Sequence, residues 1–187
     1  MRFPLINTIA IPCVFEQFVP GALHPDGRRY LPLIVLRPTI APTPGTITPT
    51  NLRLGVVDRH HLVAEGDVGR VGVARLIFAL STLRLQQPPY YSGLEPEDER
   101  SPGRASLTPT LFGQVQAVAA WEPGGEYLPY KTLYTEMAID TDVGVVGLRT
   151  TVTAENMAVA IGTERVLPGD WVELRHSRID ILAFEPE

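Results

Sequence analysis

Hydrophobic and polar residues alternate with a period of two along much of the chain. This is the pattern of strands that turn one face to a core and the other to water. It predicts strands at Leu52–Val57, Gln114–Trp121, Trp171–Arg175 and Ile179–Phe184, while a short apolar run predicts a strand at Leu31–Leu36 and the apolar residues of Val71–Phe78 predict a buried strand. A helix over Arg70–Leu85 is the competing interpretation, because five apolar residues there share one helical face. The internal Gly72 and the lack of a capping residue favour strands, so we expect an all-β protein.

A segment in the middle of the chain differs from the rest. Residues 88–110 hold five prolines and a run of acidic residues, and such a composition cannot bury enough apolar surface to fold alone. We interpret it as a linker or a long surface loop, whose start Tyr90 and Tyr91 anchor on a barrel. The predicted organisation is therefore a first half at residues 1–87, the linker at 88–110 and a second half at 111–187.

The two halves share landmarks in the same order. Tyr30-Leu31-Pro32 follows a glycine-containing turn, and so does Tyr127-Leu128-Pro129. Asn51 and Asn156 each stand before an alternating run, and Gly66-Asp67 matches Gly169-Asp170 before a strand. Each landmark has the composition of a turn between strands. The order predicts an internal duplication in which each half forms a small antiparallel β-barrel.

Composition limits the partners that the protein is expected to have. The formal net charge is −5, and Lys131 is the only lysine beside fifteen arginines, which disfavours general binding to a nucleic-acid backbone. The single cysteine, Cys13, excludes an internal disulfide and reads as a small buried hydrophobe. Apolar stretches are too short to span a bilayer, and the N-terminus is a poor signal peptide. We expect a cytoplasmic protein without membrane contact.

The second half resembles the C-terminal β-barrel of elongation factor Tu and related translation factors. The resemblance rests on three stretches in the same order and with similar spacing: Gly124–Tyr130, Ile139–Gly144 and Val166–Leu174. The first half follows the same plan more weakly. The resemblance implies two related translation-factor-like barrels in tandem, each closed by six strands and serving as a docking surface. It does not imply GTP hydrolysis, because the chain has no phosphate-binding loop with its lysine.

Few residues suggest catalysis or metal binding. Asp58, His60 and His61 form the only local cluster, but adjacent histidines in a strand point to opposite faces, so we interpret them as exposed turn residues. A metal site there is the alternative. Asp140 and Asp142 are interpreted as turn residues rather than as an acid–base pair or a cation site. We therefore predict no catalytic residue, no cofactor and no metal.

Candidate binding residues gather in the second half. Trp121 and Trp171 lie at the ends of predicted strands, where they pack on the barrel rim or offer a stacking surface. Four arginines accompany them: Arg149, Arg165, Arg175 and Arg178. If these arginines share a face with Trp171, they form a patch for RNA or for an acidic partner. Otherwise they are solvated surface residues.

Three functions remain open from the sequence. The favoured one is a non-enzymatic protein-binding module, such as an adaptor, an assembly subunit of a homo-oligomer or larger particle, or an inhibitor. The second is an RNA- or single-strand-binding barrel, by analogy with translation-factor and oligonucleotide-binding barrels, which the net charge disfavours. The third is an enzyme with a site between the halves that uses Asp58, His60 and His61.

Overall fold

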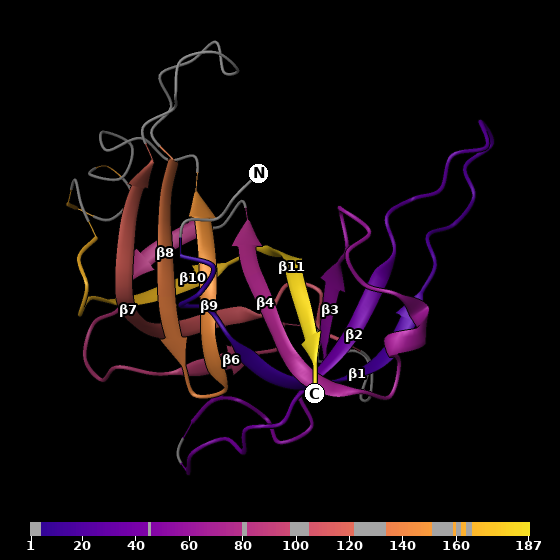
Figure 1. Ribbon diagram of the computed structural model, residues 1–187. Coiled ribbons are helices and arrows are strands. Elements are labelled where there is room, and N and C mark those ends of the chain that lie inside the picture. Colours follow the sequence, from indigo (N-terminus) through magenta and orange to yellow (C-terminus); the bar gives the residue numbers. More distant parts are fainter. Residues whose placement is uncertain are drawn as a thin grey trace.

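The protein was analysed as a computed structural model that describes residues 5–44, 46–79, 82–97, 105–121, 134–150, 159, 162–163 and 166–187. Its described elements are almost all strands, which confirms the all-β prediction (Figure 1). They are β1 (Ile11–Val19), β2 (Leu33–Pro38), β3 (Leu54–Val57), β4 (Val71–Ala79), β5 (Thr82–Leu85), β6 (Gly93–Glu95), β7 (Thr110–Trp121), β8 (Tyr134–Thr141), β9 (Gly144–Thr150), β10 (Trp171–Arg175) and β11 (Arg178–Pro186), with a 3-10 turn, η1 (Glu65–Asp67).

A closed barrel of five strands forms one side of the molecule. Its ring runs β1-β2-β3-β11-β4 and closes where β4 pairs with β1. Neighbours in the ring are antiparallel except β11 and β3, which run parallel with Asp180 opposite Val57. The barrel thus has five strands rather than the six that the resemblance implied. Its C-terminal strand β11 lies between strands from the start of the chain (Figure 1).

Inward-facing residues of the ring form the core. In β1, Ile11, Cys13 and Phe15 alternate with partly exposed residues and are fully buried. Phe15 meets Phe184 of β11 edge to face, with ring centroids 5.7 Å apart. Sequence analysis missed β1 because Pro12 and Glu16 interrupt its pattern. The strand tolerates both, since Glu16 occupies a β-bulge between Phe15 and Gln17, where the pairing with β2 shifts by one residue.

The remaining strands continue the sheet on the other side of the molecule, in the order β9-β8-β7-β10-β5, with β6 on β7. They join the barrel where β4 and β9 run parallel. The pairing of β5 with β10 continues that of β4 with β11 in the same register: Ala79 lies opposite Arg178, and Thr82 lies opposite Arg175. Each of the pairs β4–β5 and β10–β11 therefore crosses from one group of strands to the other.

The predicted strands at residues 71–78, 171–175 and 179–184 are present with closely similar bounds, so the helical interpretation of residues 70–85 is wrong. Two other expectations need correction. Part of the predicted linker is strand β6, whose Leu94 is fully buried. Asp140 belongs to β8 rather than to a turn, because it pairs with Gln114 and Val145, whereas Asp142 does lie in the β8–β9 turn.

Several features recur in both groups of strands. The bulge at Glu16 in β1 has a counterpart at Gln116 in β7, where the pairing with β8 shifts in the same way. The two Gly-Asp turns of the sequence also correspond. Asp67 accepts a hydrogen bond from the Ala64 amide, and Asp170 accepts one from the Leu167 amide. In each turn the backbone amide of the aspartate donates back to the carbonyl three residues earlier.

Candidate binding groove

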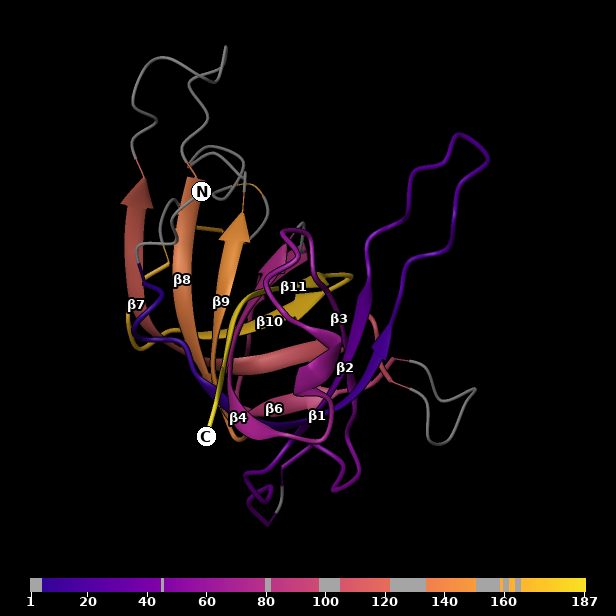
Figure 2. The same ribbon diagram turned by 45° about the vertical axis from the view of Figure 1, so that its right-hand side comes forward.

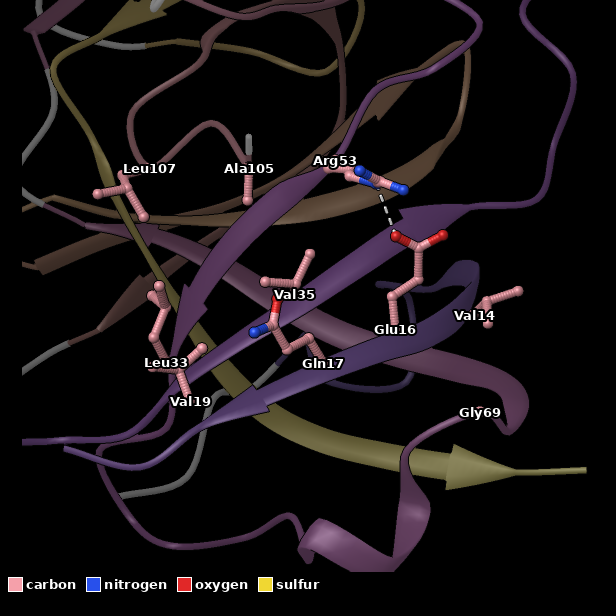
Figure 3. A pocket seen from close by; sticks show the side chains of 10 residues that line it. All are labelled: Val14, Glu16, Gln17, Val19, Leu33, Val35, Arg53, Gly69, Ala105 and Leu107. Carbon is pink, nitrogen blue, oxygen red and sulfur yellow. Dashed lines mark ion pairs between the residues drawn. The ribbon is translucent and has the colours of Figure 1, made fainter. Parts of the chain in front are cut away.

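An open groove of about 720 Å³ lies on the outer face of the barrel, over β1, β2 and β3 (Figure 3). Its walls are mostly aliphatic. The lining residues are Val14, Glu16, Gln17, Val19, Leu33, Val35, Arg53, Gly69, Ala105 and Leu107. None of these described lining residues is aromatic. The groove is therefore shaped and lined for aliphatic groups rather than for flat rings.

The apolar wall arises because β2 is apolar on both of its faces. Ile34 and Leu36 point into the core and are buried, while the alternating Leu33 and Val35 point outward into the groove. Val35 is only 7% exposed although it lies on the outside of the barrel. A run that is apolar on both faces is typical of a strand that is covered on both sides.

One end of the groove is charged. The bulge brings Glu16 and Gln17 to the same side of β1, and Glu16 binds two arginines there. Its two carboxylate oxygens lie 2.6 Å from Nε of Arg37 and 2.7 Å from Nε of Arg53 (Figure 3 draws the pair with Arg53). Both arginine side chains are 41% exposed, so the pairs are screened by water.

Residues 105–107 form a short strap along the β3 side of the groove. Ser106 forms an isolated parallel bridge with Leu54: it donates its amide to the carbonyl of Arg53 and accepts from the amide of Gly55, each at 2.7 Å. The strap lies flat because position 55 has no side chain. A Cβ there would stand 2.3 Å from a methyl carbon of Leu107.

We expect Gly55→Val to push the side chain of Leu107 away from the sheet. Because that side chain is flexible and half exposed, the free energy of unfolding is expected to fall by only about 1 kcal/mol or less. Urea unfolding followed by circular dichroism measures the change. Val71→Ile, at an exposed position of β4 away from the strap, serves as the comparison. A loss above about 3 kcal/mol in Gly55→Val would show that Leu107 cannot move aside.

A long arm projects beside the groove. The connection between β1 and β2, residues 20–32, extends beyond the barrel (Figure 2). Hydrogen bonds from Tyr30 N to Ala22 O and from His24 N to Arg28 O hold its two sides together. It carries exposed apolar side chains, Leu23 at 64% and Tyr30 at 60%. The arm and the groove form one stretch of surface, since Val19 and Leu33 lie where the arm begins and ends.

The predicted patch of tryptophans and arginines is only partly assembled. Trp171 and Arg175 lie at alternate positions on one face of β10, and Trp171 stacks on Tyr90 with ring centroids 5.4 Å apart and planes 9° apart. Tyr91 meets Phe112 edge to face, so both tyrosines anchor the start of the predicted linker as expected. The side chain of Trp121 and all of Arg165 lie outside the described residues.

The described arginines of this set form ion pairs with carboxylates, and these pairs lie in different parts of the sheet. Arg149 of β9 pairs with the buried Glu136 of β8 at 2.7 Å, and burial raises the pKa of Glu136 while Arg149 opposes that shift. Arg178 forms two hydrogen bonds to Asp180 within β11, at 2.6 and 2.9 Å. Arg175 pairs with Glu173. Arg149 and Trp171 both lie on the outer face of the sheet, but β9 is separated from β10 by two strands, so Arg149 does not lie beside Trp171.

In the cluster at residues 58–61, the aspartate holds the backbone of the following turn. Asp58 is fully buried, and its two carboxylate oxygens accept the backbone amides of Leu62 and Val63 at 2.9 and 3.0 Å. His60 and His61 are exposed, as predicted, with His61 in a left-handed conformation at φ 52°. Across the part of the chain that the structure describes, no group of three or more potential metal ligands is found.

Cys13 is buried in the barrel, as predicted, and burial raises the pKa of its thiol to about 12. At pH 8 only about 10⁻⁴ of such a group is the reactive thiolate. We therefore expect no reaction of the folded protein with an aromatic disulfide reagent such as DTNB, and one equivalent of reaction after unfolding in guanidinium. Rapid labelling without denaturant would contradict the burial of Cys13.

Sequence analysis did not predict the groove, although the hydrophobic pattern of its strands contains an indication of it. Ile11, Cys13 and Phe15 alternate in β1, and Leu33–Leu36 is apolar on both faces, which together point to a strand pair covered on its outer side. The position of Glu16 between two arginines depends on the bulge and on pairing between distant strands. No local pattern encodes that pairing.

The fold and the groove define an all-β protein with a closed five-stranded barrel and an aliphatic groove on its outer face. Comparisons of the chain with protein families, with curated proteins and with solved structures find no match. Within the described residues, no helix has the length and apolar character needed to cross a membrane.

Proposed function

We propose that this protein is a non-enzymatic binding module for another protein, and that the groove over β1, β2 and β3 is its docking site. The observation that carries the proposal is an open, aliphatic groove that continues onto an arm with exposed Leu23, Tyr30 and Leu31. Exposed apolar surface of this extent, edged by charged residues, is typical of protein–protein interaction sites.

The proposal includes the predicted duplication into two related barrels. Three observations support it. The strand order β3-β2-β1-β4-β11 in the barrel is matched by β9-β8-β7-β10-β5 among the outer strands. The bulges at Glu16 and Gln116 stand 100 residues apart in the chain. The parallel pairing of β11 with β3 has a counterpart in that of β4 with β9. On this proposal, β4–β5 and β10–β11 each give one strand to either barrel.

A specific observation favours single-stranded nucleic acid as a second candidate. Oligonucleotide-binding barrels have five strands and bind along the face of their second and third strands, beside the loop between the first two. The groove occupies that face, and the arm carries Arg28 and Arg29 beside Tyr30. Against it stand the net charge of −5 and the absence of aromatic rings among the described lining residues.

The enzyme alternative receives no support from the cluster at residues 58–61. A general base or a metal ligand needs a carboxylate oxygen that can reach a substrate or an ion. Both oxygens of Asp58 instead accept backbone amides in the core. Localisation in the cytoplasm and a translation-factor-like origin of the barrels remain predictions.

Affinity capture from a lysate of the source organism, with and without RNase, tests the proposed function. We expect at least one protein to be retained at close to equal stoichiometry, and its retention to survive RNase. Recovery of RNA, or loss of the protein after RNase, would favour the nucleic-acid candidate. The arm variant Leu23→Ser/Tyr30→Ser is expected to retain less of the partner. Tyr90 is also exposed, at 50%, but is not among the residues that line the groove, and Tyr90→Ser is expected to retain as much as wild type.

A further inference from the structure

The outer strands have a face that is covered by the chain itself. Residues Leu5, Ile6 and Ile9 lie on the outer side of β7, β8 and β9, where they form a second apolar cluster. The cluster also includes Ala117, Ala138, Val145, Ile77 and Leu182. Ile9 and Ala138 are fully buried by this arrangement.

Main-chain contacts hold this N-terminal segment on the sheet. Ala10 exchanges two hydrogen bonds with Val145 of β9, at 2.8 and 2.9 Å, as an added strand would. Arg75 of β4 donates to the carbonyls of Ile6 and Ile9, at 2.9 and 2.6 Å, and pairs with Glu185 of β11. An aliphatic segment is thus fixed by one backbone bridge and by one arginine.

The covered face and the groove occupy equivalent positions. Val35, in the wall of the groove, lies opposite Gln17, the first residue after the bulge of β1. Ala138, beneath Ile9, lies opposite Ala117, the first residue after the bulge of β7. On the third strand, Val35 faces Gly55 and Ala138 faces Gly147.

The two faces differ in how fully they are covered. On the outer strands, three large aliphatic side chains of the N-terminal segment fill the surface above Ala117 and Ala138. On the barrel, Ala105 and Leu107 are the described residues that cover the edge at Gly55, and a groove of about 720 Å³ lies beside them. Within the described part of the chain, the groove therefore has the lining of a covered face but is open.

We propose that the groove binds an extended aliphatic segment of a partner protein, in the way that the equivalent face binds residues 5–10 of the chain itself. This inference rests on the proposed function, since it names the chemistry of the segment that docks. The side chains that alternate along the segment contact Val14, Val19, Leu33 and Leu107. An extended backbone presents every second side chain to the same side, so alternate aliphatic side chains of the segment can meet the groove.

Selection of random twelve-residue peptides by phage display on the full-length protein tests this inference. We expect selected peptides to carry Leu, Ile or Val at alternate positions and few aromatic or basic residues. A synthetic selected peptide is then titrated against two variants by fluorescence anisotropy. Val19→Asp puts a charge into the groove at a position that is 37% exposed in the free protein, and Ile40→Asp puts a charge outside the groove, after the end of β2, at a position that is 40% exposed.

Binding is expected to weaken about tenfold or more in Val19→Asp and to stay within twofold of wild type in Ile40→Asp. Peptides without an aliphatic pattern, or equal binding to both variants, would overturn the inference. A dimer of the wild-type protein that Val19→Asp abolishes would assign the groove to a second copy, and tight binding of oligo(dT) that Val19→Asp abolishes would assign it to nucleic acid; either result overturns it. If a lysate partner is retained equally by Val19→Asp, the binding function stands and only the assignment of the groove fails.

Discussion

A chain that ends at Ser177 is expected not to fold. The truncation removes β11, which lies between β3 and β4 and closes the barrel. Ile179 and Ile181 of this strand are fully buried, and each contributes about 1.5–3 kcal/mol through burial. The loss also exposes the edges of two barrel strands and the ring of Phe15, which meets Phe184. The sum is comparable to the whole stability of a typical domain, about 5–15 kcal/mol.

The state of the truncated chain is read from its two-dimensional NMR spectrum and from its sensitivity to protease. We expect narrow amide dispersion and rapid digestion. Replacing His24–Arg28 at the tip of the arm by Asn-Gly removes exposed residues only, and this control is expected to keep the wild-type spectrum. A folded truncated chain with a cooperative unfolding transition would mean that the first four strands close a barrel without β11.

Asp58→Ala is expected to lower the free energy of unfolding by about 3 kcal/mol. The substitution removes a fully buried carboxylate that accepts two backbone amides, and it leaves the amides of Leu62 and Val63 without their acceptors. Hydrogen bonds to a charged group contribute about 1.5–3 kcal/mol each, and partial relaxation of the turn offsets some of the loss. Denaturant unfolding measures the change.

The exposed neighbour His60 supplies the control for Asp58. His60→Ala is expected to stay within about 0.5 kcal/mol of wild type, because surface substitutions away from specific contacts have small effects. Addition of Zn²⁺ is expected to leave the stability of both the wild type and His60→Ala unchanged. Stabilisation of the wild type by Zn²⁺ that His60→Ala abolishes would contradict the structural role that we assign to Asp58.

The strand content of the protein was predictable where the sequence alternates without interruption. Trp171–Arg175 has the predicted bounds, because it stands between the Gly169-Asp170 turn and the left-handed His176. Strand β8 was missed because Asp140 and Asp142 suggested a turn. The continuous apolar run Met137–Ile139, all of it buried, indicates a strand that continues up to that turn.

The arrangement of the strands was less predictable than their presence. The sequence predicts two halves that end at residues 87 and 187, whereas β5 pairs with β10 and β11 pairs with β3 and β4. Such pairings join residues about 100 positions apart, and the register of distant strands is set by the whole hydrophobic pattern rather than by any local motif. The groove depends on the pairings of β1 with β2 and of β2 with β3 and on the bridge between Leu54 and Ser106, together with one bulge and one glycine.

Site-specific photo-crosslinking tests most directly whether the groove is the docking site. A benzophenone amino acid is placed at Val19, in the groove, or at Ile40, outside it, and each full-length protein is irradiated with the captured partner. Our account predicts a crosslink from position 19 to one short segment of the partner and none from position 40. Crosslinks from position 40 with none from position 19 would contradict it.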